Sequence, residues 1–236
     1  HHGEGVPQDD VEAAEWYRRA AEQGHAVAQN NLGFMYDRGL GVPQDDAQAV
    51  TWYSKAAEQG YAGAQTNFGY SYSLGRGVPQ DDAQAATWFR KAADQGNAVA
   101  QFNLGAMYRD GRGVPQDDVE TVTWYRQAAE QGNAFAQSNL GVAYRDGQGV
   151  PQDYAEAVSW TCKAADQGLA DAQSRLGVMY FGGQGVPQDD VQAVSWYRKA
   201  VEQGHAGAQF NLGGMYRDGR GVPQDDAQAA TWFRKA

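Results

Sequence analysis

Cysteine and long hydrophobic runs are both scarce in this chain of 236 residues. The single cysteine, Cys162, excludes an intrachain disulfide and leaves the redox character of the compartment open. We interpret it as a tolerated substitution rather than a reactive thiol. No apolar run approaches the roughly 20 residues that a membrane span needs, and no signal peptide is evident. We therefore expect a soluble chain, and the sequence leaves cytoplasm, periplasm and secretion all open as its location.

Positive charge is in deficit. Against 19 basic residues stand 29 acidic ones, giving a net charge of −10 and a pI of about 4.8. This balance argues against nucleic acid or an anionic membrane as a partner. Many of the acids stand in a recurring Gln-Asp-Asp motif, where helix capping accounts for them. The acidity therefore belongs largely to the scaffold.

Proline is also rare, and its seven occurrences are evenly spaced. They fall every 36 residues from Pro7 to Pro223, and the seven tryptophans keep the same interval from Trp16 to Trp232. A fixed period of this size is typical of a solenoid, in which one supersecondary unit stacks on copies of itself. We predict one all-α domain over residues 1–236, an α/α superhelical solenoid of about six and a half helix-turn-helix repeats. Because the chain begins and ends within a repeat, we expect it to be part of a longer array.

Residues 25–60 illustrate the repeat. Residues 26–36 place apolar side chains on one helical face, and the glycines and proline of residues 39–43 end that helix. Asp45 is a suitable N-cap for a second helix, which Gly60 ends by supplying a left-handed C′ residue. We interpret Trp52 and Tyr53 as core residues that fill the space between one hairpin and the next.

These motifs carry a family resemblance. The strings Ala-x-Ala-Gln-x-Asn-Leu-Gly-x-Met-Tyr, Gly-x-Gly-Val-Pro-Gln-Asp and Ala-x-x-Trp-Tyr-x-Lys-Ala-Ala-x-x-Gly recur along the whole chain. The chain thereby resembles the Sel-1-like repeat family, a relative of the tetratricopeptide repeats. The resemblance implies a right-handed superhelix whose first helices line the concave side. It also implies an adaptor that assembles other proteins, in bacterial signalling or host interaction among other settings.

Positions that differ between copies locate the candidate site. On the first helix of each repeat, positions equivalent to 27, 30, 34 and 38 lie on one stripe, away from the apolar core face. Aromatic and arginine side chains, which commonly anchor protein interfaces, occur on or beside this stripe, and a row of asparagines recurs there. The predicted partner-binding residues are Asn31, Phe34, Asn67, Tyr70, Phe102, Asn103, Arg109, Phe135, Asn139, Arg145, Arg175, Phe181, Phe210, Asn211 and Arg217.

The asparagine row has two interpretations. Each amide could grip the backbone of an extended peptide, as related tetratricopeptide repeats do. Alternatively, each could bond to a neighbouring repeat and lock the superhelix. Copy five departs most from the other copies, at Tyr154, Thr161, Cys162, Arg175 and residues 181–183. Arg175 replaces the asparagine there, and in the first interpretation it favours an acidic ligand group.

No catalytic motif is recognisable. Ser-x-x-Lys, Gly-x-Ser-x-Gly, His-Glu-x-x-His and Walker-type loops are all missing. The linker histidines His25 and His205 lie five repeats apart, too far to share a metal ion or a dyad. We predict a non-catalytic scaffold that binds an extended peptide or a partner protein in its concave groove, without cofactor or metal. The alternatives are a glycan or peptidoglycan-fragment binding module and, ranked third, a β-lactam hydrolase-like activity known in cysteine-rich relatives, whose paired cysteines this chain lacks.

Overall fold

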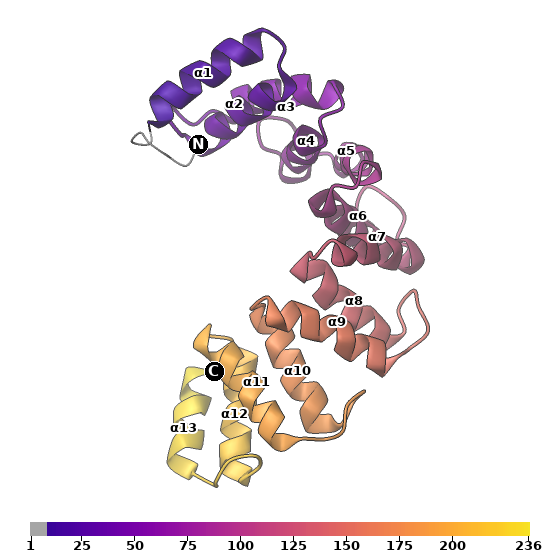
Figure 1. Cartoon of the computed structure of the whole chain (residues 1–236), viewed down its shortest axis with the longest axis vertical. Helices are drawn as coiled ribbons and strands as arrows, with labels where there is room; N and C mark the ends of the chain where they lie inside the picture. The colour runs from indigo at the N-terminus through magenta and orange to yellow at the C-terminus, as the bar shows by residue number, and fades with distance from the viewer. Residues whose placement is uncertain (1–8) are drawn as a thin grey trace. The chain divides into compact units, whose positions relative to one another are not determined.

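The computed structural model describes residues 9–236, so Pro7 lies outside the described part of the chain. These residues form two compact units, one ending at Asp117 and the other beginning at Asp118. Within each unit, consecutive helices pack against one another as neighbours (Figure 1). Over residues 9–236 the chain is helical throughout and contains no strand, which confirms the predicted all-α repeat fold.

Residues 9–236 contain thirteen helices joined by linkers, and all but the last helix have 13 residues. The first unit contains α1 (Asp10–Glu22), α2 (Ala26–Arg38), α3 (Asp46–Glu58), α4 (Ala62–Leu74), α5 (Asp82–Asp94) and α6 (Ala98–Asp110). The second contains α7 (Asp118–Glu130), α8 (Ala134–Asp146), α9 (Tyr154–Asp166), α10 (Ala170–Gly182), α11 (Asp190–Glu202), α12 (Ala206–Asp218) and α13 (Asp226–Lys235).

Side chains cap most of the helix N-termini. Asp45 accepts a hydrogen bond from the Gln48 backbone N–H at 3.0 Å, as predicted for an N-cap. The histidines lie in the linkers as predicted, where His205 caps α12 by accepting from the Ala208 N–H at 3.0 Å and His25 caps α2 in the same way. Their ring Nδ1 replaces the carboxylate or amide oxygen found at other caps. Helix α2 also extends to Arg38, two residues beyond Tyr36, where the sequence pattern placed its end.

Small residues let the helices of a hairpin approach closely. The α2–α3 hairpin buries Tyr53, and a Cβ placed on Gly33 would lie 2.8 Å from that ring. The ring therefore fills the space that a larger residue at position 33 would take. Beside it, Ala56 and Ala57 pack with Ala64 and Phe68 of α4 in one buried cluster. Each hairpin thus shares its core with the next, as a stacked repeat requires.

The glycine-rich loop packs against the preceding hairpin. Gly77 has a φ of +69°, and a Cβ there would lie 2.2 Å from the carbonyl oxygen of Asp46, in the first turn of α3. Glycine is required for both reasons, because an L side chain is strained at this φ and would clash with the backbone. The same approach recurs at the equivalent glycine of the other described copies.

A ladder of buried glutamines joins consecutive hairpins. Gln65 of α4 is 4% exposed, and its Nε2 donates to the carbonyl oxygen of Ala57 at 3.1 Å. Its Oε1 accepts from Nε2 of Gln95, 30 residues later, at 2.7 Å. The repeated motif by itself did not indicate this role for the glutamines. The same donation from the first-helix glutamine occurs in both units, from Gln29, Gln65, Gln101, Gln137 and Gln173.

The tryptophans fill the space between hairpins, with one exception. Trp52 packs against a buried cluster of α1 and α2 residues, and Trp88 lies 5.1 Å from the ring of Phe68. Trp16 differs from the other tryptophans, because it is 59% exposed. Trp16 stands in α1, and among the described residues 9–236 no first helix precedes α1 to pack on its ring.

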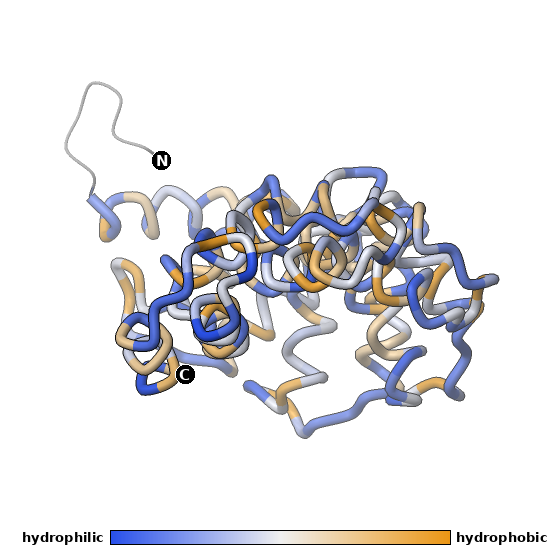
Figure 2. Tube along the Cα trace, turned by 90° about the horizontal axis from the view of Figure 1, so that it is seen from below, coloured by the Kyte–Doolittle hydropathy of each residue, from blue (hydrophilic) through white to orange (hydrophobic). Residues whose placement is uncertain are grey.

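Hydrophobic residues are distributed in short stretches along the helices (Figure 2). None of the helices between residues 9 and 236 is long and apolar enough to cross a membrane. In the same residues, no group of three or more His, Cys, Asp or Glu side chains is placed to hold a metal ion.

Candidate functional site

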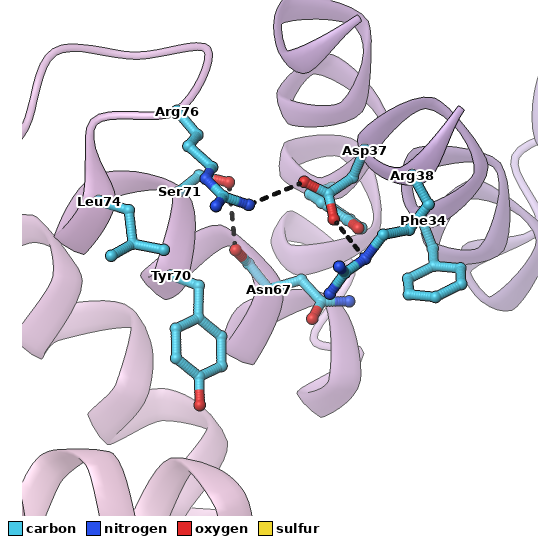
Figure 3. Close-up of a pocket in the computed structure, with 9 residues that line it drawn as sticks. Phe34, Asp37, Arg38, Asn67, Tyr70, Ser71, Leu74 and Arg76 are labelled. Atoms are coloured by element: carbon cyan, nitrogen blue, oxygen red, sulfur yellow. Dashed lines mark hydrogen bonds and ion pairs between the residues drawn. The ribbon is translucent and has the colours of Figure 1, made fainter. Parts of the chain in front are cut away.

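The first helices of the repeats are α2, α4 and α6 in the first unit and α8, α10 and α12 in the second, and we call their outer surface the first-helix face. In the first unit this face has a pocket of about 450 Å³ between α2 and α4. Figure 3 shows that Phe34, Asn67 and Tyr70 border it, and Arg76 reaches across from the loop after α4. Three predicted binding residues are therefore brought together.

The pocket also contains charged groups outside the predicted set. Arg38 Nε lies 3.2 Å from Oδ2 of Asp37, and Nη1 of Arg76 lies 3.7 Å from its Oδ1. Asp37 is thus shared by two guanidiniums whose side chains are more than half exposed. Burial, and then the charge of Asp37, raise the pKa of Tyr53 beside them, so its phenol stays neutral. The pocket combines aromatic surface, an amide and two exposed cations.

The asparagine amides make contacts between successive first helices. Asn67 Nδ2 donates to Oδ1 of Asn30 at 2.9 Å, and Asn103 Nδ2 donates to the hydroxyl of Tyr70 at 2.7 Å. These are contacts of the kind that the locking interpretation predicts. Asn67 also borders the pocket, so its amide can contact a ligand. The peptide-backbone clamp stays a prediction.

A second pocket occupies the equivalent place in the second unit, between α8 and α10. It measures about 70 Å³ and is bordered by Arg145 and Arg175 of the predicted set. Arg175 stands three periods after Asn67, and its Nη1 donates to Oγ of Ser138 at 2.6 Å. Thr161 lies where Tyr53 lies in the first pocket.

The remaining predicted residues lie on the first helices but border neither pocket. Phe135 and Phe210 are 58% and 61% exposed, and Phe210 lies 5.5 Å from the Phe233 ring. Phe181 is covered by the guanidinium of Arg220, whose carbon lies 3.9 Å from the ring centroid. Like Arg145, both Arg109 and Arg217 pair with the aspartate that follows them; Asn31, Asn139 and Asn211 are half-buried, as is Phe102.

Sequence reasoning missed Asp37, Arg38 and Arg76 as pocket residues. A signal was available for two of them, because positions 37 and 38 differ between copies. Arg76 follows the next first helix and comes from a loop that was interpreted only as a hairpin linker. Its position depends on the packing of α4 beside α2.

Stacked helical hairpins with ligand-sized pockets on the first-helix face define an α-solenoid repeat scaffold. Its family follows from the sequence motifs: the Sel1 repeat matches at residues 1–25, 26–61, 62–97, 98–133, 134–169, 170–205 and 206–236, so the chain belongs to the Sel1 repeat family. Sel1 repeats are commonly protein–protein interaction modules, and the scaffold is typically non-catalytic.

Solved structures of similar proteins support the assignment. A protective antigen present in uropathogenic Escherichia coli strains has 44% identity and a TM-score of 0.90 over 94% of this chain. The chain spans about half of that protein, 48% of its length. A Sel1 repeat protein from Oxalobacter formigenes has 41% identity and a TM-score of 0.82, with 99% of this chain and 67% of that one covered. The comparison with curated proteins found no match.

Proposed function

We propose that this chain is a non-catalytic scaffold that binds an extended peptide, or an extended segment of a partner protein, on its first-helix face. The pocket between α2 and α4 is the observation that carries the proposal. Its volume of about 450 Å³ suits one or two side chains of a ligand. It presents an apolar wall, an amide and two guanidiniums, which together are the usual chemistry of a protein-binding hot spot.

Exposure supports the same face. Phe34 is 44% exposed and has the Arg38 guanidinium 5.7 Å from its ring centroid, so the pair offers a planar apolar surface with a cation at its edge. Burial of the Phe34 ring against a partner removes apolar area from water at little cost in side-chain entropy, because phenylalanine has only two χ angles. The second helices present mainly charged and amide side chains, such as Gln48, Lys55 and Glu58, which are all exposed.

Glycan binding is the second candidate, because Phe135 and Phe210 are exposed rings that could stack on sugars. The tryptophans, which are the larger stacking surfaces, support this less well. The ammonium groups of Lys55, Lys91, Lys163, Lys199 and Lys235 lie 3.7 to 4.5 Å from the centroids of neighbouring tryptophan rings. A sugar would have to displace these cations to stack there.

A displayed library of random peptides, selected on the immobilised chain, tests the proposal. Fluorescence anisotropy then gives the affinity of each selected peptide for the wild type and for Phe34→Ala and Asn67→Ala. We expect about tenfold weaker binding by each variant, since truncation of an anchor residue typically costs ~1–2 kcal/mol. Glu58→Ala, on the exposed side of α3, is the matched control and should bind like the wild type.

Circular dichroism establishes that each variant is folded. Unchanged affinity in both folded pocket variants would place the peptide elsewhere and reject the proposal. The glycan alternative would instead be established by two results together. No peptide is selected, and the chain binds cell-wall oligosaccharides with an affinity that Phe135→Ala and Phe210→Ala weaken.

A further inference from the structure

Copy five differs from its neighbours at two positions that meet in space. At the position of Tyr53 the other six copies have tyrosine or phenylalanine, and copy five alone has threonine, Thr161. At the position of Asn67, copy five alone among the first helices has arginine, Arg175. These residues are 14 apart in sequence and come from α9 and α10, yet both border the pocket of about 70 Å³ in the second unit.

The threonine changes what faces the pocket. In the next hairpin, a Cβ on Gly177 would lie 2.5 Å from the ring of Tyr197, so the aromatic ring fills that space. At Gly141 the nearest side-chain atom is instead the Oγ1 of Thr161. The short side chain therefore puts a hydroxyl where the other copies have a ring. A space of this volume exceeds the roughly 10–15 Å³ that one water requires and can take a group of a few heavy atoms.

The guanidinium of Arg175 lacks an acidic partner in direct contact. Its only hydrogen-bond acceptor among the described residues is the neutral hydroxyl of Ser138. The two carboxylates that interact with it electrostatically, Asp171 and Asp146, each contact another residue. Asp146 is held by Arg145 through Nε at 2.7 Å and Nη2 at 2.8 Å, and Asp171 lies 3.0 Å from Nε2 of His205.

Burial increases the need for a counter-charge. Arg175 is half-buried, and loss of hydration is the main cause that lowers the pKa of its guanidinium. The charge of Asp171 partly offsets this, and the smaller effects of Arg145 and Asp146 have opposite signs. A partly dehydrated cation beside a second cation is stabilised by an anion that accepts hydrogen bonds from it. The planar guanidinium suits the two oxygens of a carboxylate.

We propose that the pocket formed by Arg145, Thr161 and Arg175 binds a carboxylate of the ligand. Arg175 donates to the carboxylate oxygens and the Thr161 hydroxyl offers a further donor, while Arg145 borders the pocket and stays paired with Asp146. This rests on the proposed function in that the carboxylate belongs to an acidic peptide on the first-helix face. Val142, Val178 and Met179 border the same pocket and pack against the methylene groups next to the carboxylate.

The carboxylate can come from a glutamate or aspartate side chain or from the C-terminus of a peptide, and small probes distinguish the two. N-acetylglutamate α-amide has only the side-chain carboxylate, N-acetylalanine only the main-chain one, and N-acetylglutamine amide neither. Each is titrated into the chain labelled with ¹⁵N-arginine, and the arginine Nε–Hε resonances are followed by NMR. We expect a saturable shift of the Arg175 resonance with one or both acids, at concentrations of the order of millimolar for probes of this size.

Two variants restore the residues of the other copies, so both are compatible with the fold. Thr161→Tyr replaces the threonine side chain, with its hydroxyl, by the bulkier ring of the neighbouring hairpins, and Arg175→Asn removes the cation. Each variant should bind the acid at least fivefold more weakly. Because Arg175→Asn has no Arg175 resonance, its affinity is measured from the Arg145 resonance. Lys199→Gln removes the same charge from the second-helix surface and should leave the affinity unchanged.

Equal shifts with the neutral amide, an absence of saturable shifts, or undiminished binding by both restored variants would each overturn the carboxylate site. The titration does not depend on any selected peptide. If the chain binds the acids but selects no peptide, only the proposed function is rejected. If the chain selects peptides that have no preference for acidic residues and does not bind the probes, only the carboxylate site is rejected.

Discussion

The buried glutamine ladder permits a quantitative prediction about stability. Gln65→Leu keeps a side chain of similar size at a site that is 4% exposed but removes two hydrogen bonds, to the Ala57 carbonyl and from the Gln95 amide. Neither partner is left wholly unsatisfied. The Ala57 oxygen still accepts from the Gly60 N–H at 3.0 Å, and the Gln95 amide still donates to the Lys91 carbonyl at 3.1 Å.

The expected loss therefore comes from two net hydrogen bonds. At about 0.5–1.5 kcal/mol each, Gln65→Leu should lower the free energy of unfolding by about 1–3 kcal/mol. For a chain of this size, each kcal/mol lowers the Tm by roughly 2–4 °C. The ladder joins consecutive hairpins, so the loss weakens the interface between repeats, on which a solenoid depends.

Urea denaturation followed by circular dichroism at 222 nm measures the effect. Gln84→Ala is the control, because Gln84 is exposed in α5, one helix further on, and its side chain makes no hydrogen bond. It should change stability by less than about 0.5 kcal/mol. If the unfolding midpoint of Gln65→Leu equals that of Gln84→Ala, the ladder does not stabilise the repeat interface and the reasoning is refuted.

Three other predictions follow from single sites. Gly77→Ala should lower the free energy of unfolding by more than Gly75→Ala does. Both glycines have a positive φ, at which alanine is strained by about 1–2 kcal/mol, but only Gly77 lies against a backbone carbonyl. Equal urea midpoints of the two variants would contradict this. Burial raises the pKa of the Cys162 thiol, so iodoacetamide at pH 7.5 should alkylate the native chain more slowly than the urea-unfolded chain. Burial raises the pKa of Tyr197 to about 12, so the unfolded chain loses this proton first and stability falls as pH rises above about 10; Tyr197→Phe should reduce that fall.

Much of the fold could be predicted from the sequence because its determinants are local. The helix breaks at Gly39 and Pro43, the cap at Asp45 and the left-handed Gly60 each act within a few residues of themselves. A single repeat is enough to place them. The glutamine ladder was missed for the opposite reason. Gln65 and Gln95 are 30 residues apart and meet only when hairpins stack.

The site was only partly predictable for a related reason. Variation between copies indicated Phe34 and Tyr70, and the recurring asparagine row indicated Asn67; all three border one pocket. The sequence could not indicate that Asn67 Nδ2 donates a hydrogen bond to Asn30, because that contact depends on the spacing between α2 and α4. Nor could it place Arg76, whose loop reaches back over the preceding repeat.

The two pockets show how a repeat scaffold can vary its chemistry without altering its fold. Equivalent positions three periods apart supply Asp37 and Arg145 on one wall and Asn67 and Arg175 on another, while the flanking glycines and buried alanines are unchanged. A substitution at such a position changes a pocket and leaves the cap, the loop and the core of the hairpin in place. Function on this scaffold is therefore expected at the few positions where one copy differs from the rest, and Arg175 in copy five, with Thr161 beside it, is the strongest such difference.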